Sequence, residues 1–172
     1  MTRIEIKTGD ILDLTEGILV HGCNCQGVMG SGIAGHIRKK WPAVFDAYHD
    51  RHQVSGLQLG DVIFVANTDK RQTQTIHRHL HRVTNDLPTN LIVANAMTQF
   101  DFGRDKDTVY VDYAAVSAVF SRVAMLARDS GLTVNFPLIG CGLANGHWEQ
   151  VAAAIAAVTP VQVNLVLWKL TP

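Results

Sequence analysis

The strongest constraint on this chain is a glycine-rich stretch over residues 21–35, which reads HGCNCQGVMGSGIAG. The apolar run Gly17–Val20 before it predicts a buried strand, and His36–Lys40 after it predicts the first turns of a helix. A glycine-rich turn between a strand and a helix builds an anion site, because unpaired N–H groups point outward from the helix N-terminus. The alternative interpretation is a tight turn that only needs positive φ angles.

A second glycine-rich stretch, residues 139–146 (IGCGLANG), has the same setting. It follows a strand predicted over 132–138 and precedes a helix predicted over 147–158, which Pro160 ends. The first stretch has neither the spacing of an ATP-binding P-loop nor that of a dinucleotide fingerprint. Because ligand-binding loops of an α/β sheet lie at the carboxyl ends of its strands, we expect both stretches to hold a diphosphate in one crevice.

Composition narrows the class of protein. The 172 residues suit one domain, and a formal net charge of zero gives no electrostatic footprint for direct, sequence-specific nucleic-acid binding. No apolar run approaches the roughly 18 residues that span a membrane, so no membrane contact is expected. The three cysteines, Cys23, Cys25 and Cys141, are odd in number, which favours a reducing compartment and predicts a cytoplasmic protein.

Strands and helices alternate along the chain. Besides the strands before the two glycine-rich stretches, the pattern predicts strands over 3–7, 59–65, 90–96 and 161–168. The clearest helix is 112–130, whose apolar residues recur at helical spacing and which ends before Gly131, and a shorter one follows Pro42. With the strands at 59–65 and 90–96 paired as a hairpin, we expect an α/β fold of three layers, a central mixed sheet with helices on both faces, in a single domain over residues 1–172.

A histidine-rich segment, residues 67–90, separates the two strands of this hairpin. His77, His79 and His81 alternate, so a strand there would place three imidazoles on one face, and a metal site is one interpretation. Because no cysteine or aspartate stands nearby at a supporting spacing, we favour a solvated extension of the hairpin. No metal and no cofactor is predicted.

Two further residues point to a nucleotide. Trp168, at the end of the last predicted strand, offers an aromatic face to a base, and Asp10, in the turn after the first strand, offers an acceptor to an exocyclic amine. Together with the two glycine-rich stretches they predict a nucleotide diphosphate held by main-chain N–H groups and helix dipoles. Trp148, at the start of an apolar helix, is predicted to pack in the core.

The chain resembles the macrodomain family, which recognises ADP-ribose. The resemblance rests on GDI at 9–11, on VHGCNCQGVMGSGIA at 20–34 and on LIGCGLANGHWE at 138–149, and it extends over nearly the whole chain except the histidine-rich segment. It is greatest to the small members described as ADP-ribose 1''-phosphate phosphatases and to the terminal ADP-ribose glycohydrolase type.

This resemblance implies a role for each matching residue. Asp10 would bind the adenine amino group, with Gly9 and Ile11 beside it. Trp168 would stack on adenine, and Asn24 would face the distal ribose. The diphosphate would lie between two sets of residues: Gly30, Ser31, Gly32 and Ile33 from the first stretch, and Gly140, Cys141, Gly142, Leu143, Ala144 and Asn145 from the second.

The sequence departs from the glycohydrolase type at two positions. Gln99 stands where that type has a lysine, and Ala144 stands where it has an acidic residue. Glutamine is not a nucleophile that forms an adduct with the ribose, so covalent deglycosylation is disfavoured. The phosphatase type has a histidine at the position of His21, and we expect His21 to act as general acid or base, or else to satisfy a loop carbonyl structurally. Cys23 and Cys25 are expected to be small buried side chains rather than nucleophiles.

Three functions remain open from the sequence. The first is a metal-independent hydrolase that removes the phosphate of ADP-ribose 1''-phosphate, with His21 and Asn24 in the chemistry. The second is a hydrolase that releases ADP-ribose from a modified protein or nucleic acid. The third is a module that binds ADP-ribose without turnover. All three require the same crevice, so the fold alone does not separate them.

Overall fold

The computed structural model describes residues 2–68 and 74–172. In chain order the elements are β1 (Ile4–Thr8), a 3-10 helix η1 (Ile11–Asp13), β2 (Glu16–Cys23), α1 (Gly32–Lys40), α2 (Pro42–Ser55), β3 (Val62–Asn67), α3 (Gln74–His77), β4 (Arg82–Thr84), β5 (Asn90–Met97), α4 (Tyr113–Ser130), β6 (Val134–Phe136), α5 (Trp148–Val158) and β7 (Leu165–Lys169). Within these described residues, seven strands form one sheet in the order β1-β7-β6-β2-β5-β3-β4.

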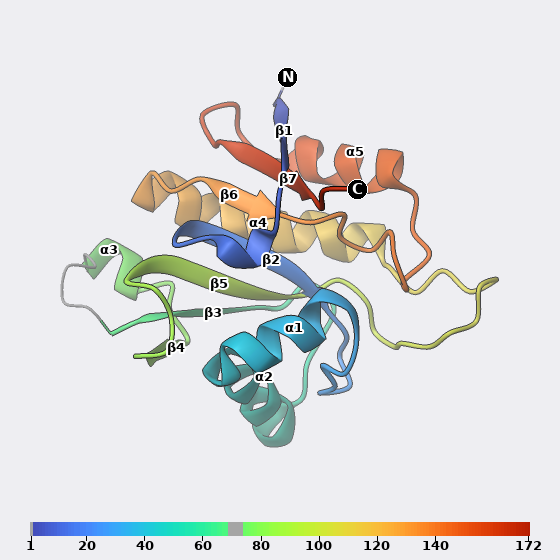
Figure 1. Cartoon of the computed structure of the whole chain (residues 1–172), viewed down its shortest axis with the longest axis horizontal. Coiled ribbons are helices and arrows are strands. Elements are labelled where there is room, and N and C mark those ends of the chain that lie inside the picture. Colours follow the sequence, from blue (N-terminus) through green and yellow to red (C-terminus); the bar gives the residue numbers. More distant parts are fainter. Residues whose placement is uncertain (1, 69–73) are drawn as a thin grey trace.

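The sheet is mixed. Strands β1, β7, β6, β2 and β5 run parallel to one another, so their carboxyl ends meet at one edge. Strand β3 pairs antiparallel with β5, which confirms the predicted hairpin, and β4 is parallel to β3. The glycine-rich stretches leave the sheet from that shared edge, at the right of Figure 1.

Helices cover both faces of the sheet (Figure 1). On one face α4 and α5 enclose a core in which Phe120 meets Phe136 edge to face, with ring centroids 5.3 Å apart. On the other face α1 and α2 pack Ile37 and Tyr48 against the sheet. The expected three-layer α/β architecture is therefore confirmed. None of the helices in the described part of the chain is long and apolar enough to cross a membrane.

Several element boundaries differ from the sequence prediction. Strand β2 extends to Cys23 rather than ending at Val20, because it pairs along its whole length with β5. Helix α1 begins at Gly32, four residues before the predicted start, since Ser31 is extended and Gly32 turns the chain with φ +59°. Strand β7 begins only at Leu165, after a turn closed by the bond from Val163 N to the Pro160 carbonyl (3.0 Å).

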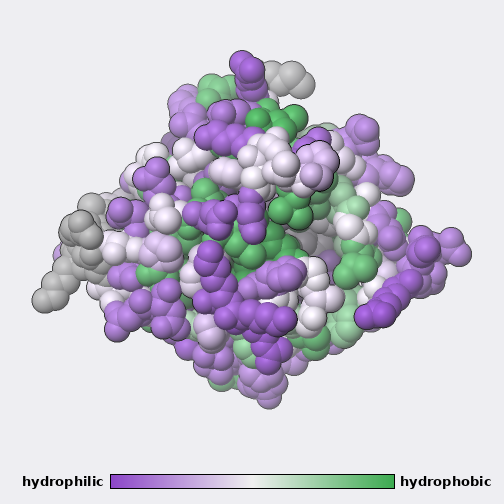
Figure 2. Space-filling model, in the orientation of Figure 1, coloured by the Kyte–Doolittle hydropathy of each residue, from purple (hydrophilic) through white to green (hydrophobic). Residues whose placement is uncertain are grey.

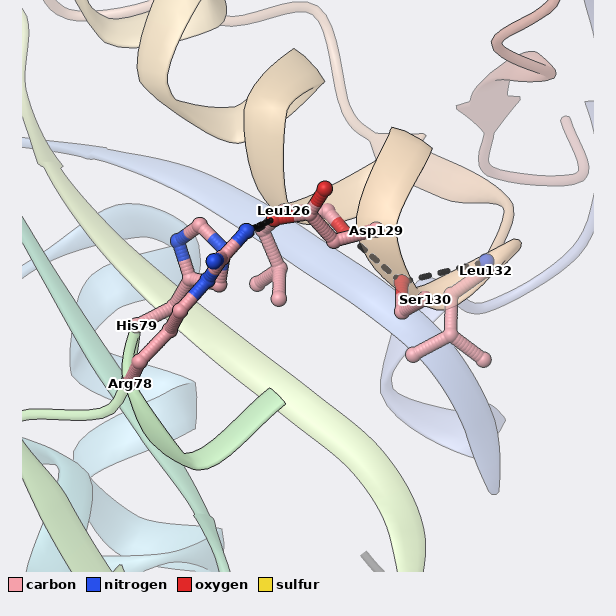
Figure 3. A network of polar contacts seen from close by, with 6 residues as sticks. All are labelled: Arg78, His79, Leu126, Asp129, Ser130 and Leu132. Carbon is pink, nitrogen blue, oxygen red and sulfur yellow. Dashed lines mark hydrogen bonds and ion pairs between the residues drawn. The ribbon is translucent and has the colours of Figure 1, made fainter. Parts of the chain in front are cut away.

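In the histidine-rich segment, residues 74–79 lie against α4, and β4 joins the sheet beside β3. His77 ends helix α3, so the three histidines do not lie on one strand face, as the metal-site interpretation would require. His79 Nε2 lies 2.7 Å from Asp129 Oδ2, and Arg78 donates to the same carboxylate (Figure 3). No cluster of three metal-binding side chains occurs within residues 2–68 and 74–172, and residues 69–73 of the segment lie outside the described residues.

Candidate functional site

The two glycine-rich stretches wall one cavity of about 480 Å³ at the carboxyl ends of β2, β5 and β6. Nine of the predicted site residues line it: Asn24, Gly30, Ser31, Gly32 and Ile33 from the first stretch and Gly140, Gly142, Leu143 and Ala144 from the second. The stretches come together because they follow parallel strands that are neighbours in the sheet, β2 and β6.

Helix α1 presents an uncapped N-terminus to this cavity. Its N-cap residue, Ser31, makes no side-chain hydrogen bond, whereas Asp112 caps α4 by accepting from Ala115 N (2.8 Å). The first N–H groups of a helix have no partner within it, so those at Gly32 and Ile33 are free to donate to a ligand. The positive end of the helix dipole adds to the attraction for an anion.

The second stretch is held in a tight fold by its glycines. Gly140 has φ +73°, and a Cβ there would lie 2.5 Å from Val111 Cγ2. Gly146 N bonds back to the Gly140 carbonyl (2.7 Å). Ala144, which stands where the glycohydrolase type has an acid, is buried and accepts from Tyr110 N (2.9 Å) through its carbonyl. This position therefore supplies no acid–base group.

A third wall of the cavity comes from a loop that the sequence analysis passed over. This 99–111 loop connects β5 with α4 and contributes Gln99, Phe102, Gly103 and Arg104 to the lining. It projects to the right in Figure 1, and Figure 2 shows hydrophilic surface at its tip. The loop has no glycine motif, so its sequence did not predict that it borders the cavity. Gln99 was noted only because it stands where the glycohydrolase type has a lysine.

Asn24 lines the cavity with an amide that is already fixed. Its Nδ2 donates to the Val28 carbonyl (2.8 Å), and its Oδ1 accepts from Gln26 N (2.9 Å) and from the Tyr48 hydroxyl (2.8 Å). The second Nδ2 proton is left for a ligand oxygen. Asn24 thus shapes the first stretch and offers one oriented donor.

His21 does not line the cavity. Strand alternation turns it toward α2, and the parallel register sets it opposite Asn95. Asn95 Nδ2 donates to the Val44 carbonyl (3.0 Å), so Asn95 Oδ1 accepts from His21 Nε2 (2.6 Å). Burial lowers the pKa of the completely buried His21 to about 4. The expected role as general acid or base has no support in this geometry.

The cavity holds few groups for chemistry. Among its described lining residues, Arg104 is the one with a charged side chain, and none is a histidine, aspartate, glutamate or lysine. Burial raises the pKa of the Cys23 thiol far above neutrality, and that of Cys25 to about 11, so neither offers a thiolate. The cavity can orient a ligand and donate hydrogen bonds, but it carries no side chain poised to exchange protons near neutral pH.

The residues predicted at the adenine end lie together beside the cavity rather than in its lining. Asp10 caps η1, accepting from Leu12 N (2.9 Å), and Ile11 is buried beneath it. Trp168 donates from Nε1 to Asn135 Oδ1 (2.8 Å), and its ring lies so near Gly9 that a Cβ there would be 3.2 Å away. Asp10 and Ile11 follow β1 and Trp168 lies near the end of β7, so these residues share the sheet edge from which the two glycine-rich stretches leave.

Two residues predicted in the second stretch, Cys141 and Asn145, also lie outside the lining. The Cys141 thiol contacts the Ile139 carbonyl (3.4 Å). Asn145, with φ +58°, donates from Nδ2 to the carbonyls of Asp105 (2.9 Å) and Thr108 (2.7 Å). Asn145 therefore ties the second stretch to the 99–111 loop.

Comparison with known proteins gives matches over most of the chain. Residues 20–155 match the model of the Macro domain. An ADP-ribose 1''-phosphate phosphatase of Meyerozyma guilliermondii is 23% identical over 90% of this chain and 93% of its own length. A DNA ADP-ribosyl glycohydrolase of Mycobacterium tuberculosis is 25% identical over 86% of this chain but 36% of its own. The structure of the macrodomain of M. tuberculosis DarG superposes with a TM-score of 0.70 over 98% of both chains, at 21% identity.

Proposed function

The chain belongs to the Macro domain family, and we propose that its cavity binds ADP-ribose or a derivative substituted on the distal ribose. The observation that carries this proposal is the uncapped N-terminus of α1, which faces the second glycine-rich stretch across the cavity. Backbone donors on both sides suit a diphosphate, because they approach its oxygens without side chains in between. The matching relatives are named for reactions of ADP-ribose derivatives, which agrees with such a ligand.

The order of strands gives the ligand a direction along the sheet edge. Asp10 follows β1 and Trp168 lies near the end of β7, the two strands at one side of the parallel part of the sheet. The two glycine-rich stretches follow β6 and β2 in the middle, and Gln99 follows β5 at the other end. With adenine at Asp10 and the diphosphate at the centre, the distal ribose lies near Asn24 and Gln99.

The reaction we propose is removal of the phosphate from ADP-ribose 1''-phosphate. The printed name of the relative that covers 90% of the chain supports it. In this proposal Asn24 and Gln99 hold the distal ribose, and the N–H groups of α1 stabilise negative charge. Covalent release of ADP-ribose from a macromolecule is disfavoured, since Gln99 and Ala144 replace the lysine and acid of that type.

A module that binds ADP-ribose without turnover is the second candidate. The lining favours it, because among the described residues no histidine or carboxylate borders the cavity. Both candidates share the binding mode, so the test must measure binding and turnover separately.

The test is titration calorimetry with ADP-ribose together with phosphate release from ADP-ribose 1''-phosphate. Gly32→Val places a branched side chain in the cavity, and we expect it to abolish both signals. Gly56→Val is the matched control, because Gly56 also has positive φ (+74° against +59°) and open space around a Cβ, but it caps α2 outside the cavity. Binding with phosphate release supports the phosphatase, and binding alone supports the second candidate. A folded wild type that binds neither ligand contradicts the proposal.

A further inference from the structure

Arg104 is the feature of the cavity that the binding of ADP-ribose leaves unused. It lines the cavity from the 99–111 loop, and within the described lining it carries the one charged side chain. The structure gives its guanidinium no ion pair with an acid of residues 2–68 or 74–172. An exposed arginine on the lining of a cavity whose other lining residues are uncharged attracts an anion, and its planar guanidinium suits phosphate.

The position of Arg104 along the sheet edge decides whether it is nearer the diphosphate or a phosphate on the distal ribose. Gln99 N bonds to the Cys23 carbonyl (3.4 Å), so the 99–111 loop starts beside Asn24. The diphosphate site lies on the other side of Asn24, between the stretches that follow β2 and β6. Arg104 belongs to the same loop and the same lining as Gln99, beside which the distal ribose is proposed to lie.

The loop holds this position through contacts that do not use Arg104. Asn145 Nδ2 bonds to the Asp105 carbonyl (2.9 Å), immediately after Arg104. Asp105, the acid next in sequence, turns its carboxylate back into the loop, where it accepts from Asp107 N (3.0 Å) and from the Thr108 hydroxyl (2.8 Å). The Asp105 carboxylate is thus occupied by donors within the loop, and the backbone next to Arg104 is anchored by Asn145.

We propose that the Arg104 guanidinium binds the phosphate on the distal ribose and thereby makes the cavity prefer ADP-ribose 1''-phosphate to unphosphorylated ADP-ribose. This inference rests on the proposed function. It adds a specificity-determining residue, because the backbone donors at the diphosphate treat both ligands alike. The extra phosphate carries up to two negative charges, and Arg104 is the cation within the described lining that can pair with them.

The test compares Arg104→Gln with Lys106→Gln, a matched loss of one positive charge from the same loop at a residue outside the lining. Displacement of labelled ADP-ribose, measured within seconds of mixing so that turnover is negligible, gives the dissociation constants of both ligands. We expect the wild type and Lys106→Gln to bind ADP-ribose 1''-phosphate about tenfold more tightly than ADP-ribose. In Arg104→Gln this preference should fall to about one, with the affinity for ADP-ribose within about twofold of wild type.

Dependence on pH and salt separates a charge contact from a structural effect. The second pKa of a phosphate monoester is about 6, so its charge grows between pH 5 and 7.5, and the wild-type preference should grow with it. Arg104→Gln should show no such rise, and added salt should lower the preference of the wild type and of Lys106→Gln but not that of Arg104→Gln. Equal weakening of both ligands in Arg104→Gln, or an equal loss in Lys106→Gln, would overturn the inference. If the wild type binds neither ligand, the proposed function itself is wrong.

Discussion

Two sets of polar side chains lie at the ends of the paired strands β2 and β5, and they have opposite surroundings. His21 is sealed beneath the cavity, paired with Asn95 and excluded from solvent. Asn24 and Gln99, just beyond the strand ends, border the cavity. His21 and Asn95 connect β2, β5 and α2 and stabilise the fold. Asn24 and Gln99 are the residues proposed to contact the ligand. A residue of a binding motif can therefore serve the fold alone, and variants should separate the two roles.

The largest effect is expected from Asn95→Leu. Loss of the amide leaves His21 Nε2 buried without its oxygen acceptor and removes the bond that Asn95 adds to the Val44 carbonyl, which costs about 3 kcal/mol of the free energy of unfolding. For a chain of this length that lowers Tm by about 10 °C. Thermal unfolding followed by circular dichroism measures the shift.

Asn90→Leu is the control, since Asn90 is exposed at the start of the same strand and should change stability by at most about 0.5 kcal/mol. At a temperature where both variants are folded, their affinities for ADP-ribose should agree. An Asn95→Leu protein as stable as Asn90→Leu would mean that the buried network does not hold the layers together.

The pH dependence of stability sharpens the same comparison. The pKa of His21 is lowered to about 4 in the folded protein, against 6.5 for an unperturbed histidine, so the unfolded chain takes up the proton first. The stability that His21 contributes is therefore complete above about pH 6.5 and falls by about 3 kcal/mol as the pH drops to 4. Denaturant unfolding across this range measures the loss.

His21→Gln provides the reference for this measurement. Glutamine keeps an amide N–H for Asn95 but does not titrate, so the difference between the two stability profiles isolates the imidazole. Parallel profiles for wild type and His21→Gln would show that His21 is solvated and titrates normally. That result would also restore it as a candidate for acid–base chemistry.

The sequence predicted the architecture well because the strands and helices follow from patterns of neighbouring residues. Helical spacing and Gly131 predicted α4, whose C-terminus the glycine ends in the left-handed conformation, and alternation predicted β1. The position of both glycine-rich stretches after strands was enough to place them around one crevice. These features depend on residues near one another in the chain.

The fate of His21 could not be predicted in the same way. Its burial depends on Asn95 and Val44, which are distant in sequence and reach it only through the register of β2 with β5 and the packing of α2. The 99–111 loop was not predicted to border the cavity for a related reason. Its position depends on a bond from Asn145, in the second glycine-rich stretch, to the Asp105 carbonyl. Long-range contacts of this kind leave no local pattern.

The ligand side of the comparison is tested by Asp10→Asn, at the proposed adenine end. Asp10 uses one carboxylate oxygen to cap η1 through Leu12 N and leaves the other for the adenine amine. Asparagine keeps the capping oxygen but replaces the second acceptor with a donor, so binding of ADP-ribose should weaken by about 1–3 kcal/mol with little change in stability. Calorimetry and thermal unfolding measure the two effects. Asp10→Ala, which removes both, should weaken binding similarly and also lower Tm, and unchanged affinity in both variants would move adenine away from Asp10.

The smallest effect is expected at Asn145, a residue that holds the 99–111 loop in place and through it the proposed ligand contact of Arg104. Asn145→Gly preserves the positive φ of 58° and removes the amide that holds the Asp105 and Thr108 carbonyls. Arg104 keeps its charge but loses part of its anchoring, so the preference for ADP-ribose 1''-phosphate should fall about threefold, less than the loss in Arg104→Gln. The same displacement assay measures it, with ADP-ribose itself as internal control. A preference unchanged in Asn145→Gly would show that the bonds from Tyr110 N and Val111 N to Ala144 suffice to hold the loop, and that Asn145 stabilises only its own stretch.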